Sequence, residues 1–328
     1  MRPTFSASPL LYLLPRLPVV VADAVCHVHE VRVPDYPDGP RPSSTVTLRG
    51  AGEQGHGELV AWTRAGHERL AERMQEVPRG AARLGEWIGA MARHFHDPYE
   101  RAALEAAAID LVLRQHQTNL FRLARAAPTP VRYVVSFGRT SDPLALLRRE
   151  PPNLGLKIDV DPAWTDETWA ALADAGRIAV LDFKGAGGAA DLERACRVPR
   201  ALVEDPPPSA PLPDALRDRL SADAPITSAG VLDTLPVRPA AVNVKPARMG
   251  GVLEALACVA WCDAAGVSVY FGGMFEVGPG RRQLWDLAAL LAPEGTNDVA
   301  PIAVGEAPAR RPPRLVVDPT RSGFGAGA

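Results

Sequence analysis

The sequence predicts an α/β protein in which an N-terminal α+β unit precedes a (β/α) barrel. Three observations carry this prediction. The 328 residues, 47% of them hydrophobic, can bury a large core and suggest about two domains. Short extended segments followed by helical patterns fill the first 125 or so residues. After Pro128, apolar runs of about four to six residues recur at a spacing of roughly 16 to 26 residues, with helix-like segments between several of them.

The N-terminal unit is predicted to contain antiparallel strands and then helices. The segments HVHEVRV and STVTLRG are strand-like, and the Pro-rich PDYPDGPRP separates them. The clearest helix begins after Asp97, a candidate N-cap with Pro98 in the first turn, and its apolar residues recur at helical spacing as far as Ala124. The Gly and Pro content from Pro34 to Gly57 predicts a mobile lid.

The second unit contains seven apolar runs, which favour a closed barrel over an open sheet. They are RYVVSF, LGLKIDV, IAVLDF, RALVED, APITSA, AAVNVK and VSVYFGG, with NDVAPIAV as a candidate eighth. A dinucleotide-binding fold is the weaker alternative, because no GxGxxG follows the first run. In a parallel barrel the C-terminal strand ends meet at one mouth, so polar residues that end these runs should converge there.

Carboxylates and lysines occupy those strand ends. Residues two positions apart on a strand point to the same face, so three pairs should each share a face: Lys157 with Asp159, Asp182 with Lys184, and Asn243 with Lys245. Glu204 ends a further strand at the same opening. At least three carboxylates and three lysines would then surround one opening. For any single residue, a ring of salt bridges that closes the barrel end is the alternative to a functional role.

Composition excludes several classes of partner. The net charge of −2, with basic residues scattered among acidic ones, argues against nucleic acid. The N-terminal apolar run is interrupted by Pro15, Arg16 and Pro18 and is too short to span a membrane. Four cysteines without metal-binding spacing suit a reducing compartment, so we expect a cytoplasmic protein. All seven histidines lie in the first 116 residues, which leaves lysine chemistry for the barrel.

These segments resemble the enolase superfamily, and within it the muconate cycloisomerase and o-succinylbenzoate synthase group. The helical segment after Asp97 resembles the long capping-domain helix, VLDFKG and VEDPPP resemble the metal-ligand strands, and VNVKPARMGG and VYFGGMFEVGPGR resemble the last strands. The resemblance implies a modified (β/α)7β barrel whose C-terminal mouth is covered by a capping domain. We therefore expect a capping domain at 1–127, a barrel at 128–303 and a tail at 304–328 that could pack back on the capping domain.

The same resemblance implies a lyase or isomerase that removes a proton next to the carboxylate of a small substrate. Such chemistry needs concentrated positive charge, which Mg²⁺ on hard oxygen ligands supplies. Asp182 and Glu204 match metal ligands, and Ser228 falls at the third position, where the superfamily usually has an acidic pair. The loss of that carboxylate predicts weak or absent Mg²⁺ binding.

The implied catalytic positions also depart in part from the superfamily pattern. Lys157, Lys245 and Glu276 match it. Asp159 stands where the superfamily carries a second lysine, and Lys184 stands where Asn is common. The resemblance therefore implies lysine chemistry with an altered second strand.

Two functions remain open from the sequence. One is a divergent enzyme of this superfamily; the other is a catalytically degenerate barrel that binds a small carboxylate ligand or acts as an interaction module. The three departures at the mouth favour the second. The retained acidic residues and Lys245 favour the first, because a barrel without chemical demands could end its strands more cheaply with neutral residues. A homo-oligomer is compatible with either.

Overall fold

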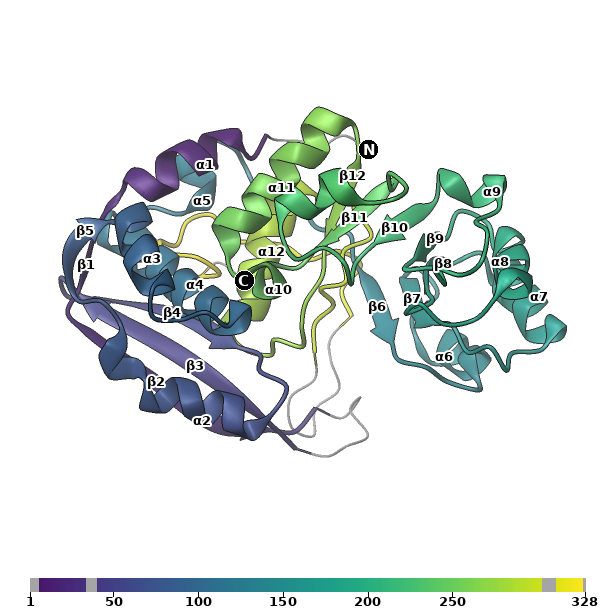
Figure 1. Cartoon of the computed structure of the whole chain (residues 1–328), viewed down its shortest axis with the longest axis horizontal. Coiled ribbons are helices and arrows are strands. Elements are labelled where there is room, and N and C mark those ends of the chain that lie inside the picture. Colours follow the sequence, from purple (N-terminus) through teal and green to yellow (C-terminus); the bar gives the residue numbers. More distant parts are fainter. Residues whose placement is uncertain (1–5, 34–39, 303–310, 327–328) are drawn as a thin grey trace.

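The computed structural model describes residues 6–33, 40–302 and 311–326, and it contains a capping domain packed against a parallel barrel (Figure 1). The capping domain occupies the left of the view, in purple and blue, and the barrel occupies the centre and right. The expected fold class is confirmed. The first part of the expected lid, 34–39, lies outside the described residues.

The capping domain has two small antiparallel sheets. Strand β1 (Pro18–Val21) pairs with β5 (Gly80–Arg83), and β2 (Asp23–Val31), β3 (Arg41–Gly50) and β4 (Glu53–Leu59) form a three-stranded sheet. Most of the described part of the expected lid is therefore regular strand rather than loop. The helical elements of the domain are α1 (Ser8–Leu13), η1 (Leu14–Arg16), α2 (Arg64–Glu72), η2 (Met74–Glu76), α3 (Leu84–Ala92), α4 (Pro98–Gln115) and α5 (Leu120–Ala124).

Helix α4 is the central helix of the capping domain, and its start follows from its sequence. The Asp97 side chain accepts a hydrogen bond from the backbone N–H of Tyr99 at 2.8 Å, as an N-cap should. The helix packs closely on β4, where Gly57 leaves room: a Cβ there would lie 2.0 Å from the carbonyl oxygen of Ala103. The predicted helix from Asp97 to Ala124 is interrupted between α4 and α5.

The barrel is a seven-stranded parallel sheet whose strands follow one another in chain order. Each strand except the fifth is followed by an α-helix, and a 3-10 helix follows the fifth. The strands are β6 (Val134–Phe137), β7 (Gly155–Asp159), β8 (Ile178–Asp182), β9 (Leu202–Glu204), β10 (Leu220–Ala222), β11 (Ala241–Val244) and β12 (Ser268–Phe271). The helices are α6 (Pro143–Arg149), α7 (Asp166–Ala175), α8 (Ala189–Cys196), α9 (Asp214–Arg217), η3 (Ala229–Thr234), α10 (Pro246–Met249), α11 (Val252–Ala265) and α12 (Pro279–Leu291).

Two residues close the barrel at its eighth position. Asn297 forms a parallel bridge with Tyr133, just before β6, and Asp298 forms one with Gly272, just after β12. The Asn297 side chain also accepts from the backbone N–H of Phe271 at 2.8 Å. The predicted eighth run, NDVAPIAV, thus contributes two bridging residues between β6 and β12 in place of a full strand.

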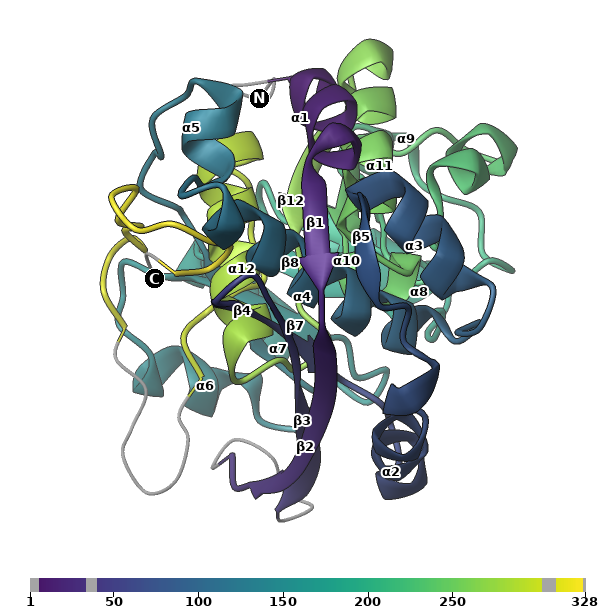
Figure 2. The same ribbon diagram turned by 90° about the vertical axis from the view of Figure 1, so that its left-hand side faces the viewer.

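The capping domain contacts the C-terminal side of the barrel at the segments that follow β11 and β12, and it faces the viewer in Figure 2. Glu58, at the end of β4, accepts hydrogen bonds from the backbone N–H groups of Val277, Gly278 and Gly280, in the segment after β12. Glu105 on α4 accepts from the N–H of Leu253 in the first turn of α11 at 2.8 Å. Both contacts lie beyond the C-terminal ends of β11 and β12.

The C-terminal residues contact both units. Phe324 N–H donates to Asp110 of α4 at 2.7 Å, and Gly325 N–H donates to Asp286 of α12 at 2.6 Å. We keep the division into 1–127, 128–303 and 304–328 as a proposal. No helix in the described part of the chain is both long and apolar enough to cross a membrane.

Candidate active site

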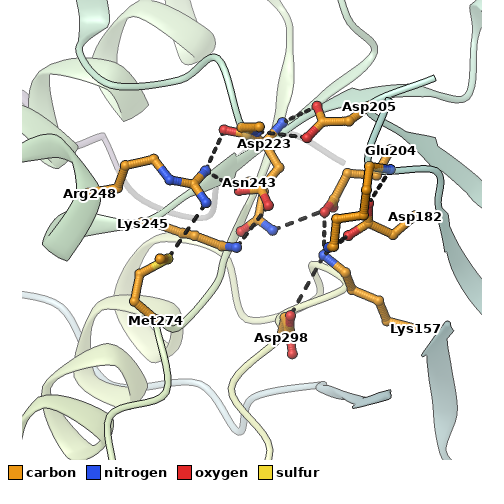
Figure 3. Close-up of polar contacts among 12 residues, drawn as sticks. Lys157, Asp182, Glu204, Asp205, Asp223, Asn243, Lys245, Arg248, Met274 and Asp298 are labelled. Atoms are coloured by element: carbon orange, nitrogen blue, oxygen red, sulfur yellow. Dashed lines mark hydrogen bonds and ion pairs between the residues drawn. The ribbon is translucent and has the colours of Figure 1, made fainter. Parts of the chain in front are cut away.

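Three carboxylates end neighbouring barrel strands and form what we call the carboxylate cluster: Asp182, Glu204 and Asp223 (Figure 3). Asp182 and Glu204 are the last residues of β8 and β9 and pair in register, and Asp223 directly follows β10. Their ligand oxygens lie within 4.8 Å of one another. All three residues are buried, with at most 3% of their surface exposed.

Asp223 is the member that was not predicted. The predicted strand at 224–229, which put Ser228 at the third ligand position, is wrong, because β10 ends at Ala222. Ser228 instead directly precedes η3. The expected loss of the third carboxylate is wrong for the same reason. The sequence LSAD repeats the apolar-then-acidic pattern of VLD and VED, and this repetition was the available signal.

Asp205 fixes the position of Asp223. Its carboxylate accepts from the backbone N–H of Asp223 at 2.9 Å and from that of Ala224 at 2.7 Å. Asp205 itself has a φ of 44°, in the left-handed region that non-glycine residues seldom adopt. The Asp205 side chain therefore holds the loop that carries Asp223.

Lys157 of β7 supplies positive charge on what we call the β8 side of the cluster. Its Nζ pairs with Glu204 and lies 3.0 Å from Asp182 Oδ2 and 3.7 Å from Asp298 Oδ2. Only 2% of the side chain is exposed. Burial opposes its charge, but the carboxylates of Glu204, Asp298 and Asp182 raise the pKa of Lys157 well above its usual value. Lys157 is therefore a fixed cation.

Lys184 brings a second ammonium to the β8 side. Its Nζ pairs with Asp182 and lies 3.3 Å from Asp159 Oδ1. Asp159, the last residue of β7, pairs in register with Asp182, so the expected catalytic position does reach the site. In contrast to Lys157, the Lys184 side chain is 45% exposed.

The β11 side of the cluster has one carboxylate and two cations. Lys245 Nζ lies 2.8 Å from Asp223 Oδ2, and Arg248 Nη1 lies 2.7 Å from Asp223 Oδ1 (Figure 3). The same Arg248 nitrogen donates to the Asp223 carbonyl oxygen at 2.6 Å. Burial opposes ionisation of Asp223, but the charges of Lys245, Lys157 and Arg248 hold the pKa of its carboxyl below the usual range.

Glu204 is the least readily ionised member of the cluster. It is fully buried, and burial raises the pKa of its carboxyl to about 8 even though Lys157 opposes the shift. The Tyr270 hydroxyl donates to Glu204 Oε2, and Ser221 Oγ lies 2.8 Å from that hydroxyl. Asp182 behaves oppositely: burial disfavours its charge, but Lys157 and Lys184 lower its pKa.

Glu276 lies in the segment between β12 and α12 rather than in the carboxylate cluster. Its Oε2 accepts from the backbone N–H of Met274 at 2.9 Å and lies 3.9 Å from Arg281 Nη2. Phe275, directly before it, has a φ of 75°, which marks a locally strained turn. Its catalytic assignment stays a prediction.

The cluster suits a divalent cation of the magnesium type. Three carboxylates that each offer an oxygen within a 4.8 Å span match the hard-oxygen preference of Mg²⁺. Among the described residues, Asn243 also has a buried side-chain oxygen, Oδ1, without a hydrogen-bond partner, while its Nδ2 donates to Glu204 at 3.4 Å. That oxygen lies against Gly272, where a Cβ would be only 2.2 Å from it, so the three carboxylates are the observation that indicates a cation site.

A compositional signal also points to this site. Lys157, Lys184 and Lys245 are the only lysines in the chain, against 33 arginines. All three contact the carboxylate cluster. Arginine cannot lose its proton under ordinary conditions and presents a rigid fork, whereas lysine is a compact point charge that can act as an amine. The three lysines of the chain are therefore concentrated where a compact ammonium contacts a carboxylate.

Two family descriptions match the chain. Residues 127–306 match the C-terminal domain of the family described as "domain of unknown function (DUF8230)", and residues 13–123 match its N-terminal domain. Together these two matches cover the capping domain and the barrel.

The chain is also similar to three individual proteins. An N-succinylamino acid racemase from Thermus thermophilus is 28% identical over 280 residues, which cover 75% of this chain and 74% of that protein. An o-succinylbenzoate synthase from Enterococcus faecalis is 26% identical over 293 residues, 70% of this chain and 71% of that protein. The structure of a dipeptide epimerase from Methylococcus capsulatus, in complex with Mg and the dipeptide L-Arg-D-Lys, has a TM-score of 0.76 at 20% identity and covers 93% of this chain and 98% of that one.

Proposed function

Because the chain belongs to the DUF8230 family and is a divergent enzyme of the enolase superfamily, we propose that it removes the proton next to the carboxylate of a small substrate. The observation that carries the proposal is the buried carboxylate cluster with lysines on two sides. This combination suits a reaction in which negative charge develops on the substrate and an amine takes up a proton.

Different residues of the site would bind the metal ion, remove the proton and orient the carboxylates. Asp182, Glu204 and Asp223 would hold Mg²⁺, which when bound supplies positive charge to stabilise the developing charge on the substrate carboxylate. Lys245 is the candidate base, since its amine is buried at the mouth and has a single carboxylate, Asp223, as its ion-pair partner among the described residues. Lys157, locked between carboxylates, keeps its charge and orients them.

Glu58 and Glu105 contribute by holding the capping domain on the mouth. Each binds backbone N–H groups of segments that follow barrel strands, so each would keep the capping domain close to the C-terminal end of the barrel. A covered site excludes water, which would otherwise quench a reactive carbanion and weaken the electrostatic interactions.

The first candidate reaction is an isomerisation by proton transfer on a single carbon. Such a reaction needs a base on one face of the substrate and a proton donor on the other, and Lys245 and Lys184 lie on opposite sides of the carboxylate cluster. Racemase and epimerase activities among the similar proteins support this choice, and N-acylated amino acids and dipeptides are the substrates to try first.

The second candidate is elimination of water by a lyase. Its specific support is the similarity to an o-succinylbenzoate synthase. Elimination needs an amine on only one face, so it would depend on Lys245 and not on Lys184.

Proton exchange in deuterated water tests the proposal. The protein with Mg²⁺ is incubated with N-succinyl amino acids, dipeptides and the precursor of o-succinylbenzoate, and ¹H NMR follows the signal of the proton next to the carboxylate. Exchange accompanied by inversion indicates an isomerase, and loss of water indicates a lyase. Exchange should fall at least about a hundredfold in Lys245→Met. Turnover of any substrate to a product that keeps its original proton next to the carboxylate would contradict the proposal.

A further inference from the structure

The β8 side of the carboxylate cluster contains two cations that differ in freedom. Lys157 contacts three carboxylates and is 2% exposed, so burial and ion pairs fix the position of its ammonium. Lys184 is 45% exposed and contacts two carboxylates, Asp182 and Asp159. Only one of these two carboxylates, Asp182, belongs to the cluster that would hold a cation. Lys184 therefore has one partner inside the cation site and one outside it.

The backbone of Lys184 is held by hydrogen bonds, whereas its side chain is 45% exposed. Its N–H donates to Asp182 Oδ1 at 3.1 Å, and the N–H of Gly185 donates to the Asp205 carbonyl oxygen at 2.8 Å. Lys184 has a φ of 51°, a left-handed conformation that is costly for lysine and natural for glycine or asparagine. A lysine retained at such a position, in a chain with only three lysines, indicates that its ammonium group is needed.

We propose that Lys184 is a displaceable cation: it neutralises Asp182 when the site is empty and transfers to Asp159 when a divalent cation binds. An ammonium that stayed on Asp182 would be strongly repelled by that cation. Asp159 lies within reach at 3.3 Å and gives the ammonium an alternative partner, so the charge stays paired. Lysine suits this exchange because a single point charge on a flexible stem can change partners, whereas the arginine fork would be held by two bonds.

The inference explains why both Asp159 and Lys184 differ from the residues common in the superfamily. Asp159 and Lys184 replace residue types that the superfamily commonly carries at those places, and they contact each other across β7 and β8. As a pair they place an ammonium beside the site, although Asp159 stands where the superfamily carries a second lysine on β7. The inference rests on the proposed function only in requiring that a divalent cation binds at the carboxylate cluster.

Calorimetric titration with Mg²⁺ and Mn²⁺ gives the first test, on the full chain. Lys184→Asn, which removes the charge and suits the left-handed backbone, should tighten binding about tenfold or more. Lys184→Arg, the charge-matched control, should bind more weakly than the unmodified protein because its fork holds Asp182. Asp159→Asn should also weaken binding, because the displaced ammonium loses its second partner. Equal affinities of the Lys184→Arg variant and the unmodified protein would overturn the transfer.

A crystal structure of the protein with Mg²⁺ gives the second test. We expect the contact between Lys184 Nζ and Asp182 to be broken and the contact with Asp159 to remain. A cation bound while Lys184 stays on Asp182 would overturn the inference and leave the proposed function intact. Failure of the unmodified protein and Lys184→Asn to bind either cation would overturn the inference, and proton exchange measured without added metal would then decide the proposed function separately.

Discussion

The two sides of the carboxylate cluster solve the same electrostatic problem in different ways. On the β11 side, Lys245 and Arg248 share one carboxylate, Asp223, and both are largely buried. On the β8 side, Lys157 and Lys184 share Asp182, but one is fixed and the other is half exposed. A fixed arrangement suits a group that must be aimed at a substrate, and a movable one suits a site that must accept and release a cation.

The largest effect should follow from loss of the amine on the β11 side. Lys245→Met should lower turnover by about 100- to 10,000-fold, as for removal of a general base. Steady-state kinetics on a substrate identified by proton exchange checks this. Unchanged turnover would remove Lys245 from the mechanism and favour the β8 side as the source of the base.

Removal of the fixed cation should mainly affect stability. Lys157→Met leaves Glu204 and Asp182 buried without their shared partner and should lower the free energy of unfolding by about 3–5 kcal/mol in metal-free buffer. Mg²⁺ should restore part of that loss because it supplies charge at the same carboxylates. Urea unfolding with and without Mg²⁺ measures both effects.

Lys184→Asn is the matched control for that stability measurement, because it removes a cation from the same side at a half-exposed position. We expect a cost of about 1 kcal/mol or less. Equal losses for the two variants would show that burial does not distinguish the two lysines, and the contrast between fixed and movable cations would fail.

The pH dependence of cation binding should reflect Glu204. Because burial raises the pKa of this carboxyl to about 8, it carries a proton at lower pH that a cation must displace. Mg²⁺ affinity should therefore rise with pH, by up to about tenfold per pH unit, and level off above about pH 8. Calorimetry in buffers of different ionisation enthalpy should detect about one proton released near pH 7. An affinity independent of pH from 6 to 8.5 would show that Glu204 is already ionised.

A similarly small effect should come from the arginine on the β11 side. Arg248→Lys keeps the charge but loses the second guanidinium nitrogen, Nη2, which donates to Met274 Sδ at 3.6 Å while Nη1 binds Asp223. We expect a loss of about 1 kcal/mol in the free energy of unfolding and a weaker constraint on Asp223. A neutral result in thermal and urea unfolding would mean that Lys245 alone is enough to hold the β11 side.

The barrel could be predicted from sequence because its strands are apolar runs that end in charged residues. Asp182, Glu204 and Lys245 follow directly from that pattern and from the resemblance. Asp223 escaped because β10 has only three residues, too few to stand out beside the longer apolar stretch that follows it. Its local signal, the pattern LSAD, becomes decisive only with the pairing of β10 to β9 and β11.

Other members of the site depend on contacts that local sequence does not encode. Asp298 reaches Lys157 only because the chain closes the barrel at residues 297–298. Arg248 reaches Asp223 from the short helix α10, one strand further on. The capping contacts of Glu58 and Glu105 join residues more than a hundred positions apart. Such pairings become visible only once the tertiary arrangement is known.

Because all three lysines lie at one site, amine-directed chemical modification of side chains would be confined to that site. An amine-directed acylating reagent has only the chain's α-amino group and three side chains to attack, and of those side chains only Lys184 is substantially exposed in the folded protein. Burial opposes the charge of Lys184, but Asp182 and Asp159 raise the pKa of its ammonium, so a tag beside Asp182 would require alkaline conditions and prior blocking of the α-amino group. The native chain offers a chemical handle at the place where cation occupancy would be read.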